Sequence, residues 1–562
     1  MFGVPRILLA LLAAFALSAA PAQAHSNHSP QHGHGHHHGH HAKPRTVDLQ
    51  VLGLNDLHGN LEPTLVSGKD AGGVAWLGGY IAAARAQNPK GTIVAHAGDT
   101  VGASPLISSW FHDEPTIVAT NLMGLDVGTL GNHEFDEGGT EMLRLINGGH
   151  RDDGKQFKDG VDTSDPDFPG ADYPYVSANV TYADSGRYVL PPFTVIKREG
   201  IKVGFIGVTT TETPSIVVPD AVAPFKFGDI SDAVNKQVKV LHRLGVHTIV
   251  VLAHAGGFMT PAPPSGEIID ETRQMDPDVD LVVAGHTHSL LNTRVNNALV
   301  VQAFRYGTAF DKVTLTVDRR TKDVTASTAD VITTYHDANA PAPQQDLAQL
   351  VQTFKDRIAP VASRVVGTST SEITRDGAGL TPAGESELGD LIADGQAHET
   401  GAQIALMNPG GIRENLKAGQ LTFGDLFAVQ PFDNGLVKMT LTGDQIKQIL
   451  EQQFTDTASG PNDKILQVSG IKETYDRTRA AGDRITSLTL ADGTPIDPAA
   501  SYTVAANSFL ATGGDGFTVF KQGTGVTSFG TDVDALEHYV ESLTQPFSAP
   551  DPFAAPRITK AG

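Results

Sequence analysis

GNHEFD at Gly131–Asp136 and GHTHS at Gly285–Ser289 decide the fold, because each begins where an apolar run ends. The runs that precede them are DVGTL and DLVVAG. Similar runs, VDLQVLGL, TIVAHA, KVGFIGV and TIVVLA, alternate with amphipathic segments such as SDAVNKQVKVLHRLG. This alternation of strands and helices predicts an α/β domain over residues 46–335.

Side chains that bind metal ions follow the predicted strands. The set is Asp56, His58, Asp99, Asn132, His133, Asp136, His254, His286 and His288. In an open α/β sheet, ligand sites collect beyond the carboxyl ends of the strands, so these separate motifs can converge on one crevice. Oxygen and imidazole ligands without sulfur suit Zn, Mn or Fe. A carboxylate such as Asp99 can bridge two ions, which clamp the attacking and leaving oxygens of a phosphoryl displacement.

The order D-x-H, G-D, G-N-H-E, H and G-H-x-H resembles the calcineurin-like metallophosphoesterase superfamily. The resemblance implies a four-layer αββα domain with two divalent metal ions, such as Zn or Mn. It implies a first metal site of Asp56, His58, Asp99 and His288 and a second of Asp99, Asn132, His254 and His286. His133 would stay unliganded. Oriented by Asp136, it would stabilise the transferring phosphoryl group or assist the leaving oxygen while a metal-bound water attacks.

A second, smaller domain of α/β or α+β type is expected over residues 367–550. The prolines of HDANAPAPQQ and the helical spacing of DLAQLVQTFKDRIAPVASRVV predict a hinge and linker helix over residues 336–366. Beyond them, LGDLIADGQAHE and GDQIKQILEQQF read as helices. DNGLVKMTLT, RITSLTLAD and SYTVAANSF read as strands.

Three loops of this second domain are similar to the substrate domain of bacterial 5'-nucleotidases and UDP-sugar hydrolases: NPGGIRENL, VQPFDNGLV and NSFLATGGDGF. The resemblance implies that Phe432 and Phe509 sandwich a nucleobase and that Asp515 binds ribose hydroxyls. Stacking suits any base because every base has a π-face. A place in the core is the alternative for each phenylalanine.

Anion-binding candidates lie in the same domain. Arg413 can form a fork to phosphate or carboxylate, with a solvated arginine as the alternative, and Asn408 of the same motif is a further substrate-binding candidate. Many family members carry an arginine before the LG-x-L helix start, where this chain has Gly384. Arg375 is the candidate to replace it.

The N-terminus and the composition bound the cellular context. MFGVPRILLALLAAFALSAAPAQA predicts a signal peptide over residues 1–24 and an exported protein, periplasmic, extracellular or associated with the cell surface. Residues 25–45 form a His-rich leader, expected to be disordered, which either collects extra metal or acts as a spacer or tag. After signal cleavage we expect no membrane association. A net charge of −22 disfavours nucleic-acid polymers as partners, and the lack of cysteine excludes thiolate sites.

These observations favour a secreted phosphohydrolase with two metal ions that releases phosphate from nucleotides, a 5'-nucleotidase type. The alternatives of the same architecture are a 2',3'-cyclic-nucleotide phosphodiesterase, a UDP-sugar diphosphatase and a thiosulfohydrolase-like enzyme. From a different class, the chain could be a non-catalytic zinc-binding exported protein.

Overall fold

The computed structural model describes residues 45–151, 163–260, 262–457 and 460–561. The predicted signal peptide and all of the His-rich leader except Arg45 lie outside the described residues. Among the described helices, none combines the length and the apolar character that crossing a membrane requires.

Two six-stranded sheets form the centre of the first half of the chain. The first has the order β16 (Val324–Thr333), β15 (Ala309–Asp318), β1 (Thr46–Leu54), β4 (Thr92–His96), β5 (Val127–Thr129) and β6 (Tyr175–Val176). The second has the order β13 (Leu290–Val295), β14 (Ala298–Ala303), β12 (Leu281–Ala284), β11 (Thr248–His254), β9 (Ile201–Thr209) and β8 (Phe193–Arg198). The strands β1, β4 and β5 are parallel, as are β9, β11 and β12, so each sheet gathers its carboxyl ends at one edge.

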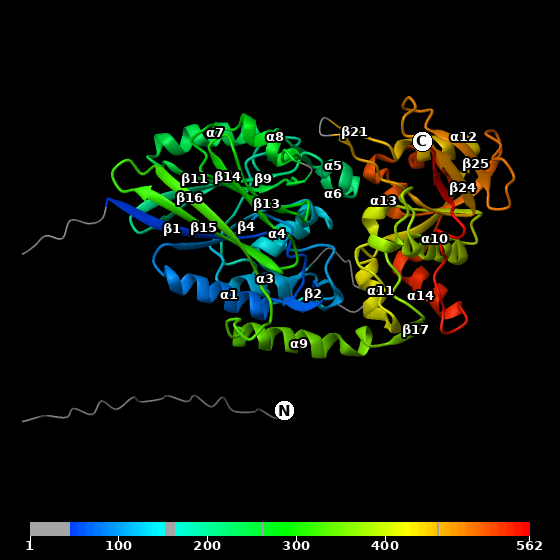
Figure 1. Ribbon diagram of the computed structural model, residues 1–562, viewed down its shortest axis with the longest axis horizontal. Coiled ribbons are helices and arrows are strands. Elements are labelled where there is room, and N and C mark those ends of the chain that lie inside the picture. The colour runs from blue at the N-terminus through cyan, green and yellow to red at the C-terminus, as the bar shows by residue number, and fades with distance from the viewer. Residues whose placement is uncertain (1–44, 152–162, 261, 458–459, 562) are drawn as a thin grey trace, which may run out of the picture. The chain divides into compact units, whose positions relative to one another are not determined.

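The two sheets pack face to face and carry helices on their outer faces. On β1, Leu49 and Val51 enter the core between the sheets, whereas Leu52 and Leu54 pack under the outer helices. Because both faces are covered, such strands are continuously apolar rather than alternating. Helices α1 (Val74–Gln87) and α3 (Glu114–Met123) lie along the first sheet, and α7 (Ile230–Arg243) and α8 (Glu267–Gln274) along the second (Figure 1). The four-layer αββα prediction is confirmed.

The second half contains a five-stranded sheet with a helix layer on each face. Its order is β23 (Gln467–Ser469), β18 (Ile404–Met407), β26 (Ser501–Asn507), β20 (Gly435–Thr442) and β27 (Thr524–Thr531). One face is covered by α10 (Glu387–Thr400) and α14 (Asp532–Ser542), and the other by α12 (Gly443–Gln452). A three-stranded sheet adds β25 (Ile485–Leu490), β24 (Ile471–Tyr475) and β28 (Ile558–Lys560).

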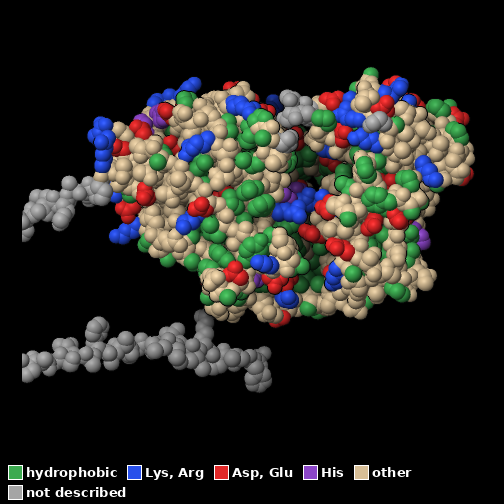
Figure 2. Space-filling model, in the orientation of Figure 1, with side chains coloured by type: hydrophobic (Ala, Val, Ile, Leu, Met, Phe, Trp, Pro, Cys, Tyr) green, Lys and Arg blue, Asp and Glu red, His purple; other side chains and the backbone are tan. Residues whose placement is uncertain are grey.

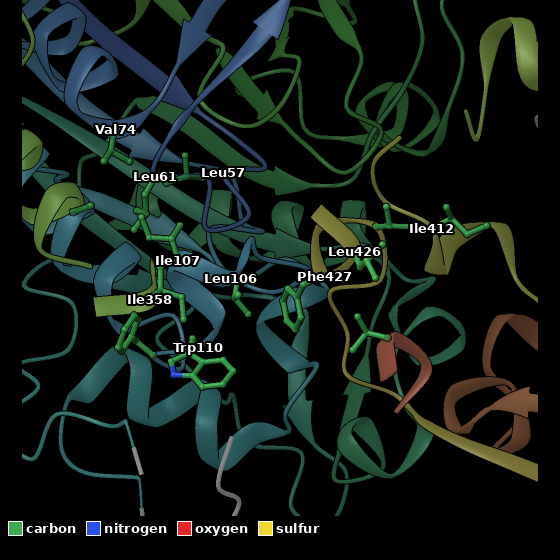
Figure 3. Packing of buried hydrophobic residues seen from close by; sticks show 14 of the residues in the cluster. Leu57, Leu61, Val74, Leu106, Ile107, Trp110, Ile358, Ile412, Leu426 and Phe427 are labelled. Carbon is green, nitrogen blue, oxygen red and sulfur yellow. The ribbon is translucent and has the colours of Figure 1, made fainter. Parts of the chain in front are cut away.

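A long helix, α9 (Gln345–Ala362), lies within the segment that the sequence marks as a linker. It contacts α1, α2 (Leu106–Ser109) and α3 of the first half and α11 (Phe423–Val429) of the second. One buried apolar cluster includes Leu106, Ile107 and Trp110 together with Leu426 and Phe427 (Figure 3). The two halves therefore share a hydrophobic core.

Candidate active site

The predicted metal ligands converge at the carboxyl ends of the central strands, and their backbone is unusual. Non-glycine residues rarely adopt positive φ. Five of the predicted ligands do: Asp56 (49°), His58 (47°), Asp99 (48°), His286 (80°) and His288 (54°). Such conformations cluster at functional sites, where the surrounding structure holds them in place.

Backbone carbonyls fix the orientation of two histidine rings. The Nδ1 atom of His58 lies 2.8 Å from the carbonyl oxygen of Gly102, and Nδ1 of His254 lies 2.8 Å from that of Ala97. A carbonyl only accepts, so each Nδ1 carries the proton and donates it. The Nε2 lone pairs of both rings then point into the site, as in most metal-ligating histidines.

The inward-facing atoms have the spacing of ligands around metal ions. The distances are 3.1 Å for His58 Nε2 to His288 Nε2, 3.4 Å for His288 Nε2 to Asp56 Oδ1, 3.6 Å for His58 Nε2 to Asp99 Oδ2, 2.9 Å for Asp99 Oδ2 to His254 Nε2 and 3.1 Å for His254 Nε2 to Asn132 Oδ1. Atoms bonded to one ion at about 2.0–2.2 Å lie about 3.0–3.5 Å apart. Lone pairs that face one another repel unless a cation lies between them.

Asp99 lies where the two groups of ligands meet. One group that could hold an ion is Asp56, His58 and His288, and another is Asp99, His254 and His286. Asp56, His58, Asp99 and His254 are almost completely buried. The donor set therefore fits two divalent cations, with Asp99 close to both.

Glu134 holds the loops that present these ligands. Its carboxylate accepts hydrogen bonds from the backbone N–H groups of Asp99 (3.0 Å), Thr100 (2.8 Å) and Gly131 (2.5 Å). Burial, followed by the charge of Asp99, raises the pKa of Glu134 to about 7. Sequence reasoning did not single out this residue, although it lies inside the GNHEFD motif.

His133 and Asp136 form a pair at the edge of the metal ligands. Nδ1 of His133 lies 2.7 Å from Oδ2 of Asp136, and the backbone N–H of His133 donates to Asp99. Burial lowers the pKa of His133, but Asp136 and Asp99 raise it more, so the net shift is upward. The ring also lies near His58 and Asp99, in a third group that could hold an ion. Its role as a free catalytic group therefore stays a prediction.

A pocket of about 660 Å³ joins this site to the second half of the chain. Its lining includes Asp99, Asn132, His133, Asp136, His286 and His288 from the first half and Asn408, Arg413, Phe432, Phe509 and Asp515 from the second. The surface is hollowed between the two halves, and basic and histidine side chains gather there (Figure 2). The structure thus brings most of the predicted site residues together.

Phe432 and Arg413 lie on the second-half wall nearest to the metal ligands. The ring of Phe432 stacks on His133 with centroids 5.8 Å apart, and the guanidinium of Arg413 lies 5.8 Å from the Phe432 ring. Nε of Arg413 is buried and has no hydrogen-bond partner among the described residues. Arg375 does not line the pocket; it donates to the backbone carbonyl of Arg413 and so supports that loop.

Asp515 is held by two side chains. Nδ2 of Asn408 lies 3.0 Å from one carboxylate oxygen, and Nζ of Lys464 lies 2.8 Å from the other. The partly buried ring of Phe509 lies directly over Gly514, where an added Cβ would come within 2.5 Å of it. Lys464 lines the pocket but stands in none of the motifs that the sequence suggested.

The fold and the ligand set define a metal-dependent phosphoesterase. Residues 49–290 match the family model described as calcineurin-like phosphoesterase, and residues 365–522 match the 5'-nucleotidase C-terminal domain. The chain belongs to the family that combines these two domains.

Relatives and a solved structure agree with this assignment. The chain is 34% identical to the endonuclease YhcR of Bacillus subtilis over 89% of its own length and 40% of that protein. It is also 34% identical to the cell wall protein Lmo0130 of Listeria monocytogenes, over 88% of its own length and 67% of that protein. The 5'-nucleotidase precursor of Thermus thermophilus matches with a TM-score of 0.77 and 27% identity, covering 92% of this chain and all of that one.

Proposed function

We propose that the chain is a 5'-nucleotidase-type enzyme that releases phosphate from nucleotides outside the cytoplasm. One observation carries the proposal: a single pocket combines the metal-ligand cluster with Phe432, Phe509 and Asp515. A phosphate suits the metal ligands, a base suits a phenylalanine ring and ribose hydroxyls suit a carboxylate. The similarity to a 5'-nucleotidase precursor supports the same substrate class.

Each half of the pocket has a distinct task in this proposal. Two divalent ions held by the ligand cluster would supply positive charge to the attacking and leaving oxygens. His133, held by Asp136, stabilises the transferring phosphoryl group or gives a proton to the leaving oxygen. Arg413 offers its unpartnered N–H to a phosphate oxygen. Phe432 and Phe509 would hold the base, and Asp515 the ribose.

The decisive experiment is product analysis with purified, metal-reconstituted protein, by chromatography of the products together with phosphate and sulfate release. The panel is AMP, ATP, a 2',3'-cyclic nucleotide, UDP-glucose, thiosulfate esters and a nucleic-acid polymer. We expect the highest kcat/KM with a nucleoside 5'-phosphate. Preference for the cyclic nucleotide or for UDP-glucose would replace this proposal by the corresponding rival. Preference for the polymer would assign this chain the kind of activity for which the relative YhcR is named.

Export and the metal content are tested separately. We propose cleavage after Ala24, so the mature protein should begin at His25 when sequenced from its N-terminus. The name of Lmo0130, a cell wall protein, supports export. Deleting residues 25–41 should leave about two ions per chain, because the active-site ligands remain. Loss of most of the metal would favour a zinc-binding protein over an enzyme.

A further inference from the structure

An exposed phenylalanine of the first half also lines the substrate pocket. Phe258 follows the ligand His254 in the chain, and 47% of its surface is exposed. It stands in none of the sequence motifs for metal or base binding. When a ligand covers an exposed apolar ring at a pocket wall, the free energy of the complex is lowered, because apolar surface is removed from water.

Backbone hydrogen bonds hold Phe258 against Ser265. Its backbone N–H donates to the carbonyl of Ser265 (2.8 Å), and the N–H of Ser265 donates back (3.1 Å). The hydroxyl of Thr287, between two metal ligands, donates to the carbonyl of Gly257. A side chain at Gly257 would lie 2.7 Å from the Ser265 carbonyl, so the loop packs closely. The backbone at Phe258 therefore has a defined position relative to the metal site.

A second segment extends the same surface. Ile216, Val217 and Val218 also line the pocket. Glu267, at the start of the helix that follows the Phe258 loop, holds the residues that precede helix α5 (Thr213–Ile216), because its carboxylate accepts from the hydroxyl of Thr210 (2.5 Å) and the N–H of Thr211 (3.0 Å). We call the three side chains Phe258, Ile216 and Val218, which are not fully buried, the apolar wall.

Through Ile216, the apolar wall meets the part of the pocket proposed to hold the nucleoside. Helix α5 (Thr213–Ile216) contacts the turn η5 (Gly514–Gly516), which carries Asp515. The ring of Phe509 lies over Gly514 of the same turn. A nucleoside bound at Phe509 and Asp515 would thus have the Ile216 end of the apolar wall beside it, with Phe258 lining the same pocket.

We propose that the apolar wall is part of the nucleobase subsite and that Phe258 is a specificity-determining residue. The inference rests on the proposed function. Base selection is then shared between the two halves of the chain. The nucleobase is the part of the substrate that matches an apolar, aromatic surface, whereas phosphate and ribose match the polar groups already described.

The test compares Phe258→Ala with Phe553→Ala. Phe553 is a matched control, since it is 55% exposed and does not line the pocket. The substrates are AMP and ribose 5-phosphate, which has the same ester and sugar but no base. For Phe258→Ala we expect a loss of about 10-fold in kcat/KM for AMP, as for one stacking contact. For Phe258→Ala, kcat/KM for ribose 5-phosphate should equal that of the wild type. For Phe553→Ala, kcat/KM should equal that of the wild type with both substrates.

Adenosine binding, measured by calorimetry on the metal-loaded protein, gives a readout without turnover. Phe258→Ala should weaken it by the same factor, and Phe258→Leu by less. Unchanged adenosine binding in Phe258→Ala would overturn the inference. An equal loss of kcat/KM with AMP and with ribose 5-phosphate would also overturn it, because the loop would then only support the metal ligands. If the wild type does not prefer AMP to ribose 5-phosphate, the proposed function itself fails.

Discussion

Replacing His133 by alanine separates catalysis from metal binding. The proposed ligands of both ions remain in this variant, and Nδ1 of His133 is already engaged by Asp136 at 2.7 Å. We expect two ions per chain as in the wild type, measured by elemental analysis. A positioned acid contributes about 10²- to 10⁴-fold, so kcat for AMP should fall by that factor, or about 2.7–5.5 kcal/mol in activation free energy.

The leaving group provides an internal check. The alkoxide that leaves AMP needs a proton, whereas p-nitrophenolate leaves without one. If His133 gives a proton to the leaving oxygen, the loss with p-nitrophenyl phosphate should be much smaller than with AMP. If it only stabilises the transferring phosphoryl group, both losses should be similar. His538→Ala is the matched control, because it removes an exposed histidine paired with Glu399 at 3.0 Å and should leave both rates unchanged.

A double-mutant cycle tests whether Asp136 acts through His133. Asp136→Asn alone should lower kcat by about 10- to 100-fold, as for other residues that orient a functional histidine. In the His133→Ala background, Asp136→Asn should lower kcat no further. Additive losses would refute this reasoning, and loss of a metal ion from His133→Ala would show that the histidine is a ligand.

Three further predictions concern the pocket and the core. Asp99→Asn should abolish turnover and lower metal content, measured by elemental analysis, because the change removes charge near both ions. Phe432→Ala and Phe509→Ala should each lower kcat/KM for AMP by a factor equivalent to about 1–3 kcal/mol. Neither change should lower kcat/KM for p-nitrophenyl phosphate. Burial raises the pKa of Asp311 well above 3.8, and its carboxylate has no partner. The folded state therefore keeps a proton that the unfolded state loses, so stability should fall by up to about 1.4 kcal/mol per pH unit between pH 3.8 and the raised pKa of the folded state. The melting temperature of Asp311→Asn should fall less steeply with rising pH than that of the wild type. The melting temperature of the exposed control Asp220→Asn should follow that of the wild type.

The strands and the order of the metal ligands were predictable because short, continuous stretches of the sequence specify them. Five central strands, β1, β4, β5, β11 and β12, are short apolar runs that end at ligand motifs, as in TIVAHAGDT. The parallel pairing of β1 with β4 and of β11 with β12 then brings the motifs to one edge. The apolar runs alone predict only strands that are covered on both faces. The four-layer arrangement was predicted from the resemblance of the motifs to the metallophosphoesterase superfamily.

Other features depend on contacts that no short motif records. Glu134 binds three backbone N–H groups, which carry no side-chain signature in the sequence. Phe258 is exposed on a loop, so only the pocket around it distinguishes it from any surface phenylalanine. Arg375 was assigned by analogy to a motif arginine, and its contact with the Arg413 carbonyl became visible only in three dimensions.

The apolar cluster that includes Leu106 and Ile107 together with Leu426 and Phe427 has a thermodynamic consequence. Exposing a buried side chain of this kind costs about 1.5–3 kcal/mol, so separating these four would cost about 6–12 kcal/mol. That is comparable to the whole free energy of unfolding of a typical domain. This shared contact couples the unfolding of the two halves, so a calorimeter should record one cooperative heat-absorption peak for residues 45–562.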